Sequence, residues 1–317
     1  MGRVPPRVDY LRISITDRCD FRCRYCMPPS GVRLGEHGDI LSYEEIVRFA
    51  QAAADAGVTR VRVTGGEPLV RRQCSGLIAS LAAIPGIKDL ALTTNGSRLA
   101  RFAPGLRAAG LGRINISLDS LDRERFAAIT GRDSLGAVRA GLERALELGF
   151  EPVKVNVVML EGIENELEAF AALTRDRPVH VRFIEKMPVG FDAAPRWKYV
   201  SHGRLLEWMA RQGELVPAAP PRGAGPARYF RFAGHRGTIG LISSMSPRFC
   251  DGCNRLRLTA DGKLKDCLFS DEEFDVRPLI AGPRRELAAA IGQVIGRKNG
   301  SRAQGRAGGR LMSQIGG

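Results

Sequence analysis

The chain has 317 residues, 44% of them hydrophobic, which is enough for one large domain or two. It has no run of about 18 apolar residues and no apolar amino-terminal stretch like a secretory signal, so we expect a cytoplasmic protein without a membrane span. The formal net charge of +14 suggests an anionic partner, but the basic residues are spread along the chain and aromatic residues make up only 6%, so solvated basic faces explain the charge equally well.

Strand and helix patterns alternate from residue 8 to about residue 185. The first strand is expected at residues 9–15, where apolar and polar side chains alternate. A helix is expected from Tyr43 to Ala56, because Ser42 and Glu45 form a capping-box pattern and Gly57 suits its end. Further strands are predicted at residues 58–63, 88–93, 113–118, 153–158 and 179–184, and further helices near 71–83, 97–109, 122–130, 134–148 and 164–174.

Strands separated by helices indicate right-handed βαβ units and a parallel sheet. Six such units fall short of the eight strands of a closed TIM barrel. The predicted fold class is therefore α/β, with an incomplete (β/α)6 TIM-like barrel that forms an open, curved sheet. In such folds the reactive groups lie beyond the carboxyl ends of the strands.

The alternating pattern ends near residue 190. We expect a barrel core at residues 1–190, a C-terminal region at 191–295 and a flexible, Gly- and Arg-rich tail at 296–317. Within the C-terminal region, Val216–Ala227 is rich in Pro, Gly and Ala and is interpreted as a loop. Residues 229–242 are typical of a β-hairpin that turns at Gly234–Gly237.

Three cysteines follow the first predicted strand at the spacing C-x3-C-x2-C: Cys19, Cys23 and Cys26. Three thiolates on one loop can hold a [4Fe–4S] cluster and leave one iron open for chemistry. A zinc site needs four ligands, and the nearby candidate for the fourth is His37. A disulfide would leave one thiol over. The iron–sulfur interpretation is favoured, and the zinc alternative remains open.

Polar or glycine-rich motifs follow the next three predicted strands. They are Thr64–Pro68 (TGGEP), Thr93–Gly96 (TTNG) and Ser117–Ser120 (SLDS). Because parallel strands end at one edge of a sheet, we expect these motifs to meet the cysteine loop there.

A second cysteine group has the spacing C-x2-C-x13-C, with Cys250, Cys253 and Cys267. It again supplies three thiols, and by itself it fits zinc, with His235 as the fourth ligand, about as well as a cluster. The seventh cysteine, Cys74, lies in a predicted helix and is expected to be a small residue, either buried or at the surface.

These motifs together resemble known families. C-x3-C-x2-C after a first strand, with GGEP after the second, resembles the radical S-adenosylmethionine (SAM) superfamily. The second cysteine group, the sequence Asn254-Arg-Leu-Arg257 and the terminal Gly316-Gly317 resemble, within it, the GTP 3′,8-cyclase family of molybdenum cofactor biosynthesis. The resemblance extends from about Asp9 to the end of the chain.

The resemblance implies a lyase that converts GTP to (8S)-3′,8-cyclo-7,8-dihydro-GTP through a 5′-deoxyadenosyl radical. It implies two [4Fe–4S] clusters and SAM as cofactors, with the second cluster in the C-terminal region binding the guanine. An electron donor is required, and cyclic pyranopterin monophosphate synthase would receive the product. The chain would act as a monomer or a homodimer.

The resemblance also assigns residues to each ligand. Cys19, Cys23 and Cys26 would ligate the first cluster, and Cys250, Cys253 and Cys267 the second. The SAM contacts would be Tyr25, Gly66, Ser117 and Met187. The GTP contacts would be Arg12, Arg62, Thr93, Lys154, Arg255, Leu256 and Arg257. The catalytic residues would be Arg255, Arg257, Gly316 and Gly317, the last two on a tail that enters the active site.

Two other function classes compete with this prediction. A peptide-modifying radical SAM protein would carry more cysteines in its C-terminal region than the three found there. A basic nucleic-acid-binding protein would explain the net charge but not C-x3-C-x2-C together with GGEP. We therefore expect neither nucleic acid nor a membrane as a partner. Arg12 and Lys154 lie within apolar strands, and we expect both to point into the volume that the sheet encloses, where an anion would offset the cost of burial.

Overall fold

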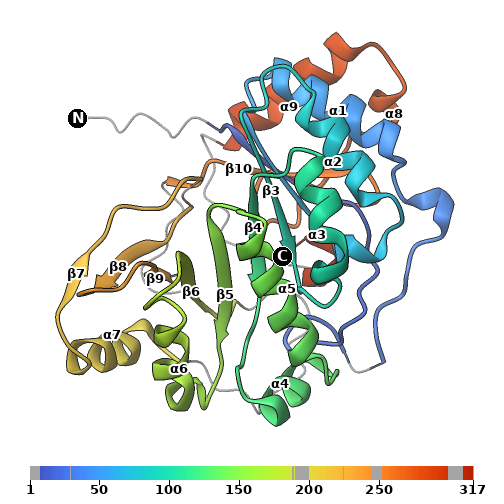
Figure 1. The fold of residues 1–317 in the computed structure, drawn as a ribbon. Coiled ribbons are helices and arrows are strands. Elements are labelled where there is room, and N and C mark those ends of the chain that lie inside the picture. Colours follow the sequence, from blue (N-terminus) through green and yellow to red (C-terminus); the bar gives the residue numbers. More distant parts are fainter. Residues whose placement is uncertain are drawn as a thin grey trace.

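The computed structural model describes residues 8–28, 30–187, 189, 200–223, 225–243, 252–298 and 310–316. Their main feature is one twelve-stranded sheet in the order β12-β11-β10-β1-β2-β3-β4-β5-β6-β9-β8-β7 (Figure 1). The strands are β1 Tyr10–Ser14, β2 Arg60–Thr64, β3 Asp89–Thr94, β4 Arg113–Ser117, β5 Val153–Met159, β6 Val179–Glu185, β7 Leu215–Pro217, β8 Arg228–Phe232, β9 Thr238–Ile242, β10 Arg255–Leu258, β11 Lys263–Lys265 and β12 Phe274–Asp275.

Helices connect the first six strands and lie on the outer side of the sheet (Figure 1). The helices are α1 Tyr43–Asp55, α2 Cys74–Ala82, α3 Leu99–Ala108, α4 Arg123–Thr130, α5 Leu135–Glu147, α6 Leu167–Ala172, α7 His202–Arg211, α8 Arg277–Ile280, α9 Arg284–Lys298 and α10 Met312–Ile315. Short 3-10 turns lie at His37–Asp39, Pro68–Val70 and Ile163–Glu166. Every strand and helix predicted before residue 185 is present, and so is the hairpin, formed by β8 and β9.

The parallel part of the sheet is wider than the sequence indicated. β10 pairs in parallel with β1, and β9 pairs in parallel with β6, so eight neighbouring strands run in one direction. The prediction of six was too low because both added strands come from the C-terminal region, outside the β/α repeat. The sheet stays open, since antiparallel strands border it at each edge.

Strand alternation gives this sheet two chemically different faces. The outer face is apolar: Leu11, Val63 and Ile116 are fully buried there in one core with helix residues such as Phe49. Burying each such side chain contributes roughly 1.5–3 kcal/mol. The inner face is polar, and most of the buried charges of the parallel strands lie on it.

The start of α1 shows how sequence sets these boundaries. Ser42 Oγ accepts from the Glu45 backbone N–H at 3.1 Å, and Glu45 Oε2 accepts from the Ser42 N–H at 2.6 Å, which is the predicted capping box. Gly57 follows the helix with φ of 97°, a conformation that favours glycine.

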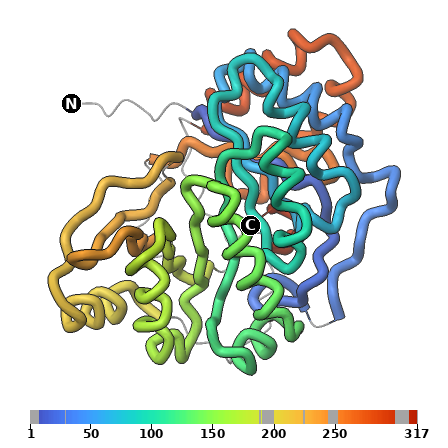
Figure 2. The backbone as a smooth tube through the Cα atoms, viewed as in Figure 1, coloured from blue at the N-terminus to red at the C-terminus, as the bar shows by residue number. Residues whose placement is uncertain are grey.

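The C-terminal helix α9 packs beside α1 although the two are far apart in sequence (Figure 2). Arg284 Nε donates to Asp55 Oδ2 at 2.6 Å across their contact. Residues 296–298, assigned to the tail from the sequence, form the last turn of α9. Residues 299–309 lie outside the described part, as do Cys250 and Gly317, and the chain is described again from Arg310.

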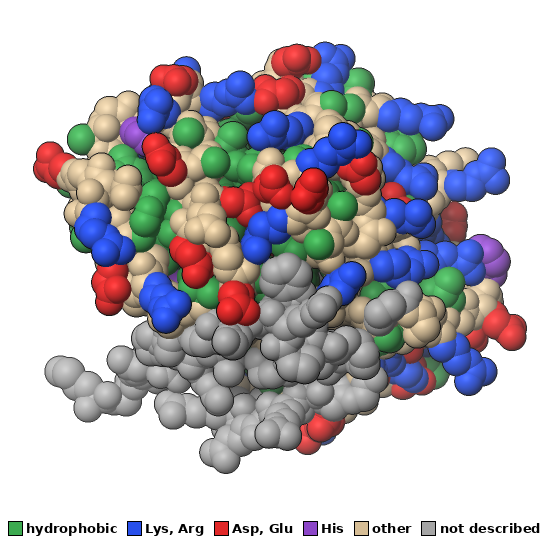
Figure 3. Space-filling view, turned by 90° about the horizontal axis from the view of Figure 1, so that it is seen from below, with side chains coloured by type: hydrophobic (Ala, Val, Ile, Leu, Met, Phe, Trp, Pro, Cys, Tyr) green, Lys and Arg blue, Asp and Glu red, His purple; other side chains and the backbone are tan. Residues whose placement is uncertain are grey.

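Charged side chains of both signs are interspersed over the face seen from below (Figure 3). The two signs are mixed on the left and in the centre of this view, whereas Lys and Arg predominate along its right side. No helix in the described ranges is long and apolar enough to cross a membrane.

Candidate active site

The loop after β1 brings Cys19, Cys23 and Cys26 together as free thiols. One turn holds them, because the Cys26 backbone N–H donates to the Cys23 carbonyl at 2.9 Å. Burial, together with the charge of Cys19, raises the pKa of Cys26 to about 12. Burial also raises the pKa of Cys23, with contributions from both other thiols. Three thiols that affect one another in this way fit a polyiron cluster, whose iron would lower these pKa values.

A site for a single metal ion needs its ligands to surround one point. Within the described ranges, no three His, Cys, Asp or Glu side chains form a group that could hold a single metal ion. Among these residues, His37 is not grouped with the loop thiols. In a cluster each thiolate binds a different iron, so the sulfurs need not surround one point.

Glu67 of the TGGEP motif joins the ends of β2 and β3. Its Oε1 accepts from Thr94 Oγ1 at 2.8 Å, and its Oε2 accepts from the Asn95 backbone N–H at 2.6 Å. Burial raises the pKa of Glu67 to about 7, although these hydrogen bonds oppose the shift. The predicted meeting of these motifs at the carboxyl edge of the sheet is confirmed.

Asn95 extends this network to the cysteine loop. Its Nδ2 donates to Asp20 Oδ1 at 2.7 Å and lies 3.9 Å from Cys19 Sγ. Ser97 Oγ donates to Asp20 Oδ2 at 2.9 Å, so two residues of the β3–α3 loop hold the residue after Cys19.

Tyr25 ties the other end of the cysteine loop to β4. Its hydroxyl donates to Asp119 Oδ2 at 2.6 Å, and Asp119 Oδ1 accepts from the Val158 backbone N–H at 2.9 Å. Burial raises the pKa of Asp119 to about 6. The motifs containing Glu67, Asn95 and Asp119 were noticed in the sequence, but these three supporting side chains were not singled out.

Gly66 has a structural role that the sequence did not specify. A Cβ atom on Gly66 would lie 2.3 Å from the Arg18 carbonyl oxygen, and the Gly66 N–H donates to the Thr16 carbonyl at 2.7 Å. Only glycine allows the chain to pass this close to the cysteine loop. Gly66 thus lies against the cysteine loop that carries Tyr25, and Ser117 ends β4 at the same edge of the sheet.

Met187 lies just beyond β6 and packs against a small apolar cluster of Val189, Leu268 and Ile315. These apolar side chains connect the end of β6 to the C-terminal segment. Met187 is therefore at the same edge of the sheet as the other predicted SAM contacts, in contact with the chain's last helix.

Arg257, Arg12 and Arg62 form one row on the inner face, because their Cα atoms are paired across β10, β1 and β2. Each side chain is at most 9% exposed. Burial, together with the charges of neighbouring arginines, lowers the pKa of Arg62 and the pKa of Arg257 to about 10. Three cations buried side by side repel one another, and an anionic ligand would offset that repulsion.

Lys154 on β5 is fully buried on the same face, so the inward orientation predicted for Arg12 and Lys154 is confirmed. Its Nζ donates to the carbonyls of Arg222 and Gly223 at 2.9 and 3.2 Å, so the β7–β8 loop reaches this face. Burial lowers the pKa of Lys154 to about 6, helped by the charges of Arg182 and Arg113.

Arg182 on β6 was not singled out from the sequence. Alternation along the strand places its side chain on the same inner face as Lys154. It is 3% exposed, its Nη2 donates to Asn115 Oδ1 at 2.8 Å, and its Nε has no partner among the described residues. Arg113 on β4 also faces inward, but it pairs with Asp89. Strand alternation alone could have found both arginines.

The remaining predicted GTP contacts differ in orientation. Thr93 lies on the inner face beside Asn115, and its buried hydroxyl has no partner within the described ranges. Arg255 is half-buried on the inner face, two residues before Arg257. Leu256 lies between Arg255 and Arg257, so its side chain points to the outer face, where it is fully buried in the core. It therefore offers only its backbone to a ligand.

The described thiols of the second group, Cys253 and Cys267, lie at the opposite end of the strands from the first group. Cys253 precedes β10, and Cys267 follows β11, which runs antiparallel to β10. Burial raises the pKa of Cys253, but Arg255 and Lys298 outweigh it and lower the pKa to about 7. β1 lies between these two ends, and its four residue steps span roughly 13 Å. His235 lies on the β8–β9 hairpin, where its Nδ1 is 2.8 Å from Thr174 Oγ1.

The C-terminal segment enters the inner face. Arg257 Nη1 donates to the Gly316 carbonyl at 2.9 Å, and a Cβ on Gly316 would lie 2.6 Å from Thr64 Cγ2. Arg310 anchors the segment, since it donates to both Asp261 carboxylate oxygens and to both oxygens of Glu273 at 2.6–3.1 Å. These two ion pairs flank the segment that contains Cys267.

Two family models match the chain. Residues 13–173 match the radical SAM superfamily, and residues 179–303 match Molybdenum Cofactor Synthesis C. Two solved structures of SuiB from Streptococcus suis share the fold. One has a TM-score of 0.61 at 15% identity and covers 94% of this chain and 69% of SuiB. The other, bound to S-adenosylmethionine, has a TM-score of 0.57 at 13% identity and covers 90% and 68%.

Closer relatives cover nearly the whole chain. The GTP 3′,8-cyclase of Moorella thermoacetica is 48% identical, with 98% of each chain covered. The GTP 3′,8-cyclase of Pelotomaculum thermopropionicum is 47% identical, with the same coverage of both chains. At this identity and coverage, the chain belongs to the GTP 3′,8-cyclase family of the radical SAM superfamily.

Proposed function

We propose that this chain converts GTP to 3′,8-cyclo-7,8-dihydro-GTP in molybdenum cofactor synthesis. The observation that carries the proposal is the position of two thiol groups at opposite ends of one buried, arginine-rich face. A nucleoside triphosphate on that face could reach both ends.

The first thiol group fits a [4Fe–4S] cluster with one open iron for SAM. When bound there, cluster and SAM supply a carbon-centred radical by one-electron reductive cleavage of SAM. The chain's part is to hold them: Glu67 and Asn95 fix the loop, and Met187 packs with Ile315 at the same edge of the sheet. Tyr25, Gly66 and Ser117 are the proposed SAM contacts on the same edge.

The inner face would bind GTP. Arg12, Arg62 and Lys154, with Arg182, would hold the triphosphate, because guanidinium groups form paired hydrogen bonds with phosphate oxygens. Thr93 would contact the nucleoside. Holding the ribose at a fixed position restricts which hydrogen atom the radical can take.

The second thiol group would bind a second cluster, with Cys250, Cys253 and Cys267 as ligands and an open iron for the guanine. Arg255 and Arg257 adjoin it. The charge of Arg255 lowers the pKa of Cys253, and the charges of Cys253 and Cys267 act to raise the pKa of Arg257. The C-terminal region that carries these residues would also close the polar face. The product would pass to cyclic pyranopterin monophosphate synthase.

Anaerobic reconstitution tests the proposal directly. We expect about eight irons per chain and release of 5′-deoxyadenosine that depends on GTP. Iron analysis and chromatography of quenched reactions measure both quantities. About four irons would refute the second cluster, and 5′-deoxyadenosine release that is indifferent to GTP would refute the substrate.

Proton uptake on binding GTP is a second prediction. The Lys154 pKa of about 6 leaves this amine largely neutral at pH 7.5, and a bound triphosphate raises that pKa again. Binding should therefore take up about one proton. Calorimetry in buffers of different ionisation enthalpy measures this uptake. Lys154→Met should lose it, whereas Lys88→Met, at an exposed lysine, should keep it; equal uptake in both variants would contradict the assignment.

A further inference from the structure

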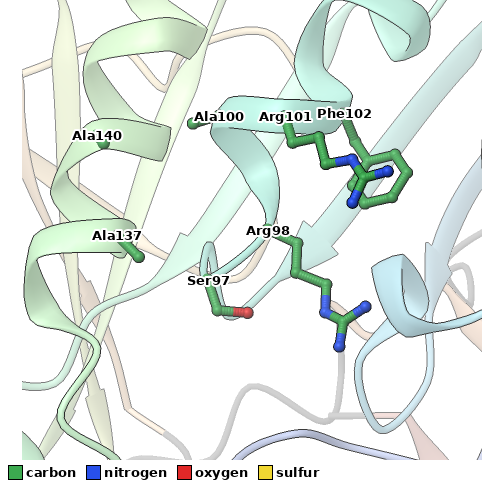
Figure 4. A pocket seen from close by; sticks show the side chains of 7 residues that line it. All are labelled: Ser97, Arg98, Ala100, Arg101, Phe102, Ala137 and Ala140. Carbon is green, nitrogen blue, oxygen red and sulfur yellow. The ribbon is translucent and has the colours of Figure 1, made fainter.

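A shallow groove lies between α3 and α5 on the outer side of the molecule. It has a volume of about 430 Å³ and is lined by Ser97, Arg98, Ala100, Arg101, Phe102, Ala137 and Ala140 (Figure 4). The two helices approach closely because α5 has Gly141 at the contact, where a Cβ would lie 2.8 Å from the Gly96 carbonyl oxygen. Small alanines on both helices leave the floor of the groove open.

The groove ends at the first cysteine loop. Ser97 lines the groove and donates its Oγ to Asp20 Oδ2 at 2.9 Å. Asp20 is bonded directly to Cys19, a proposed ligand of the first cluster. A molecule in the groove is thus separated from that ligand by one hydrogen bond and one residue.

The walls of the groove are cationic. Arg98 is 47% exposed and pairs with Asp20, and Arg101 is exposed above the Phe102 ring. Arg132 is exposed nearby and donates to the Asp20 carbonyl at 3.1 Å. No lining residue is acidic, and the neighbouring Asp133 pairs with Arg123.

We propose that this groove, with Arg98, Arg101 and Arg132, is the docking surface for a small acidic protein that carries one electron. The inference rests on the proposed function, because each SAM cleavage consumes one electron that must enter from outside the chain. The carrier is oxidised by one electron, and the first cluster is reduced by one. Charge complementarity identifies the carrier as acidic, since an anionic surface is steered toward the arginines.

A small groove suits such a partner. Electron-transfer encounters bury little surface and must dissociate after each electron, so steering by charge matters more than a large apolar contact. The alanine floor permits close approach without the deep pocket of a permanent interface.

The test compares two double variants with the same change in charge. Arg101→Glu/Ala137→Glu places acids in the groove without touching Asp20 or a cysteine. Ala210→Glu/Arg211→Glu places them on exposed positions of α7, away from the cysteine loop. Cluster reduction is followed by its absorbance without GTP, with either photoreduced flavodoxin or dithionite as the donor.

We expect the groove variant to be reduced by flavodoxin about tenfold more slowly at low salt, with the difference shrinking at high salt. The α7 variant should match the native chain, and dithionite should reduce all three alike. Equal flavodoxin rates in the two variants would overturn the docking surface, as would an equal loss with dithionite. Because GTP is absent, failure of cyclisation would count against the proposed function and leave this result unaffected.

Discussion

Replacing Cys23 by alanine is expected to abolish 5′-deoxyadenosine formation and to remove about four irons per chain. Two thiolates on the loop cannot hold a cluster with a single open iron, so the source of the radical is lost. We expect a decrease of at least about a thousandfold, which corresponds to about 4 kcal/mol of barrier. Iron analysis and SAM-cleavage assays under reducing conditions measure the two effects.

Cys74→Ala is the matched control, because Cys74 is a buried thiol in α2 that is 4% exposed and belongs to neither group. It should lower stability by about 1 kcal/mol and keep all iron. Cys250→Ala should lose the second set of irons and cyclisation while it retains more SAM cleavage than Cys23→Ala. Full iron content in Cys23→Ala would remove the basis of the first assignment.

Gly316→Ala is expected to slow cyclisation strongly with both clusters intact. Gly316 has φ of 81°, and the added Cβ would lie 2.6 Å from Thr64 Cγ2 and 3.3 Å from Ser14 Cβ. The segment must therefore move away from the inner face and release the bond from Arg257. We expect product formation to fall by about a hundredfold, or about 2.7 kcal/mol, because a displacement of about 1 Å near the reacting atoms is sufficient.

Gly292→Ala provides the comparison for that result. Gly292 lies inside α9, and a Cβ there would have no neighbour within 4 Å. The substitution should leave turnover unchanged and raise stability slightly, since alanine favours a helix. If Gly316→Ala turned over as fast as Gly292→Ala, the C-terminal segment would have no role in catalysis.

The sequence was sufficient for the first half of the fold because its signals there are local. Alternation of apolar residues located β1, β-rich runs located β2 to β6, and the capping box at Ser42 located α1. The rule that parallel strands end at one edge brought the motifs of Glu67 and Asn95 to the cysteine loop, and their hydrogen bonds confirm it.

The second half depends on contacts that no local pattern contains. β10 has only four residues and pairs with β1, which is far away in sequence. Next to this pair, the side chain of Asn254 bonds to that of Asp9, 245 residues earlier in the chain. Arg255 and Arg257 were interpreted only as ligand contacts. The alternation of Arg and Leu over residues 255–258 is also typical of a strand, which was not predicted. The anchor of Arg310 on Asp261 and Glu273 likewise depends on tertiary proximity.

The polar inner face also affects the stability of the whole protein. Arg62, Lys154 and Arg182 are buried on a surface that a purely structural sheet would fill with apolar side chains, so the ligand-free chain is less stable than its outer core would allow. An anion that binds only the folded chain recovers this deficit by mass action. The nucleotide thus completes the interior of the fold, and the heat resistance of the protein should follow the cellular supply of its substrate.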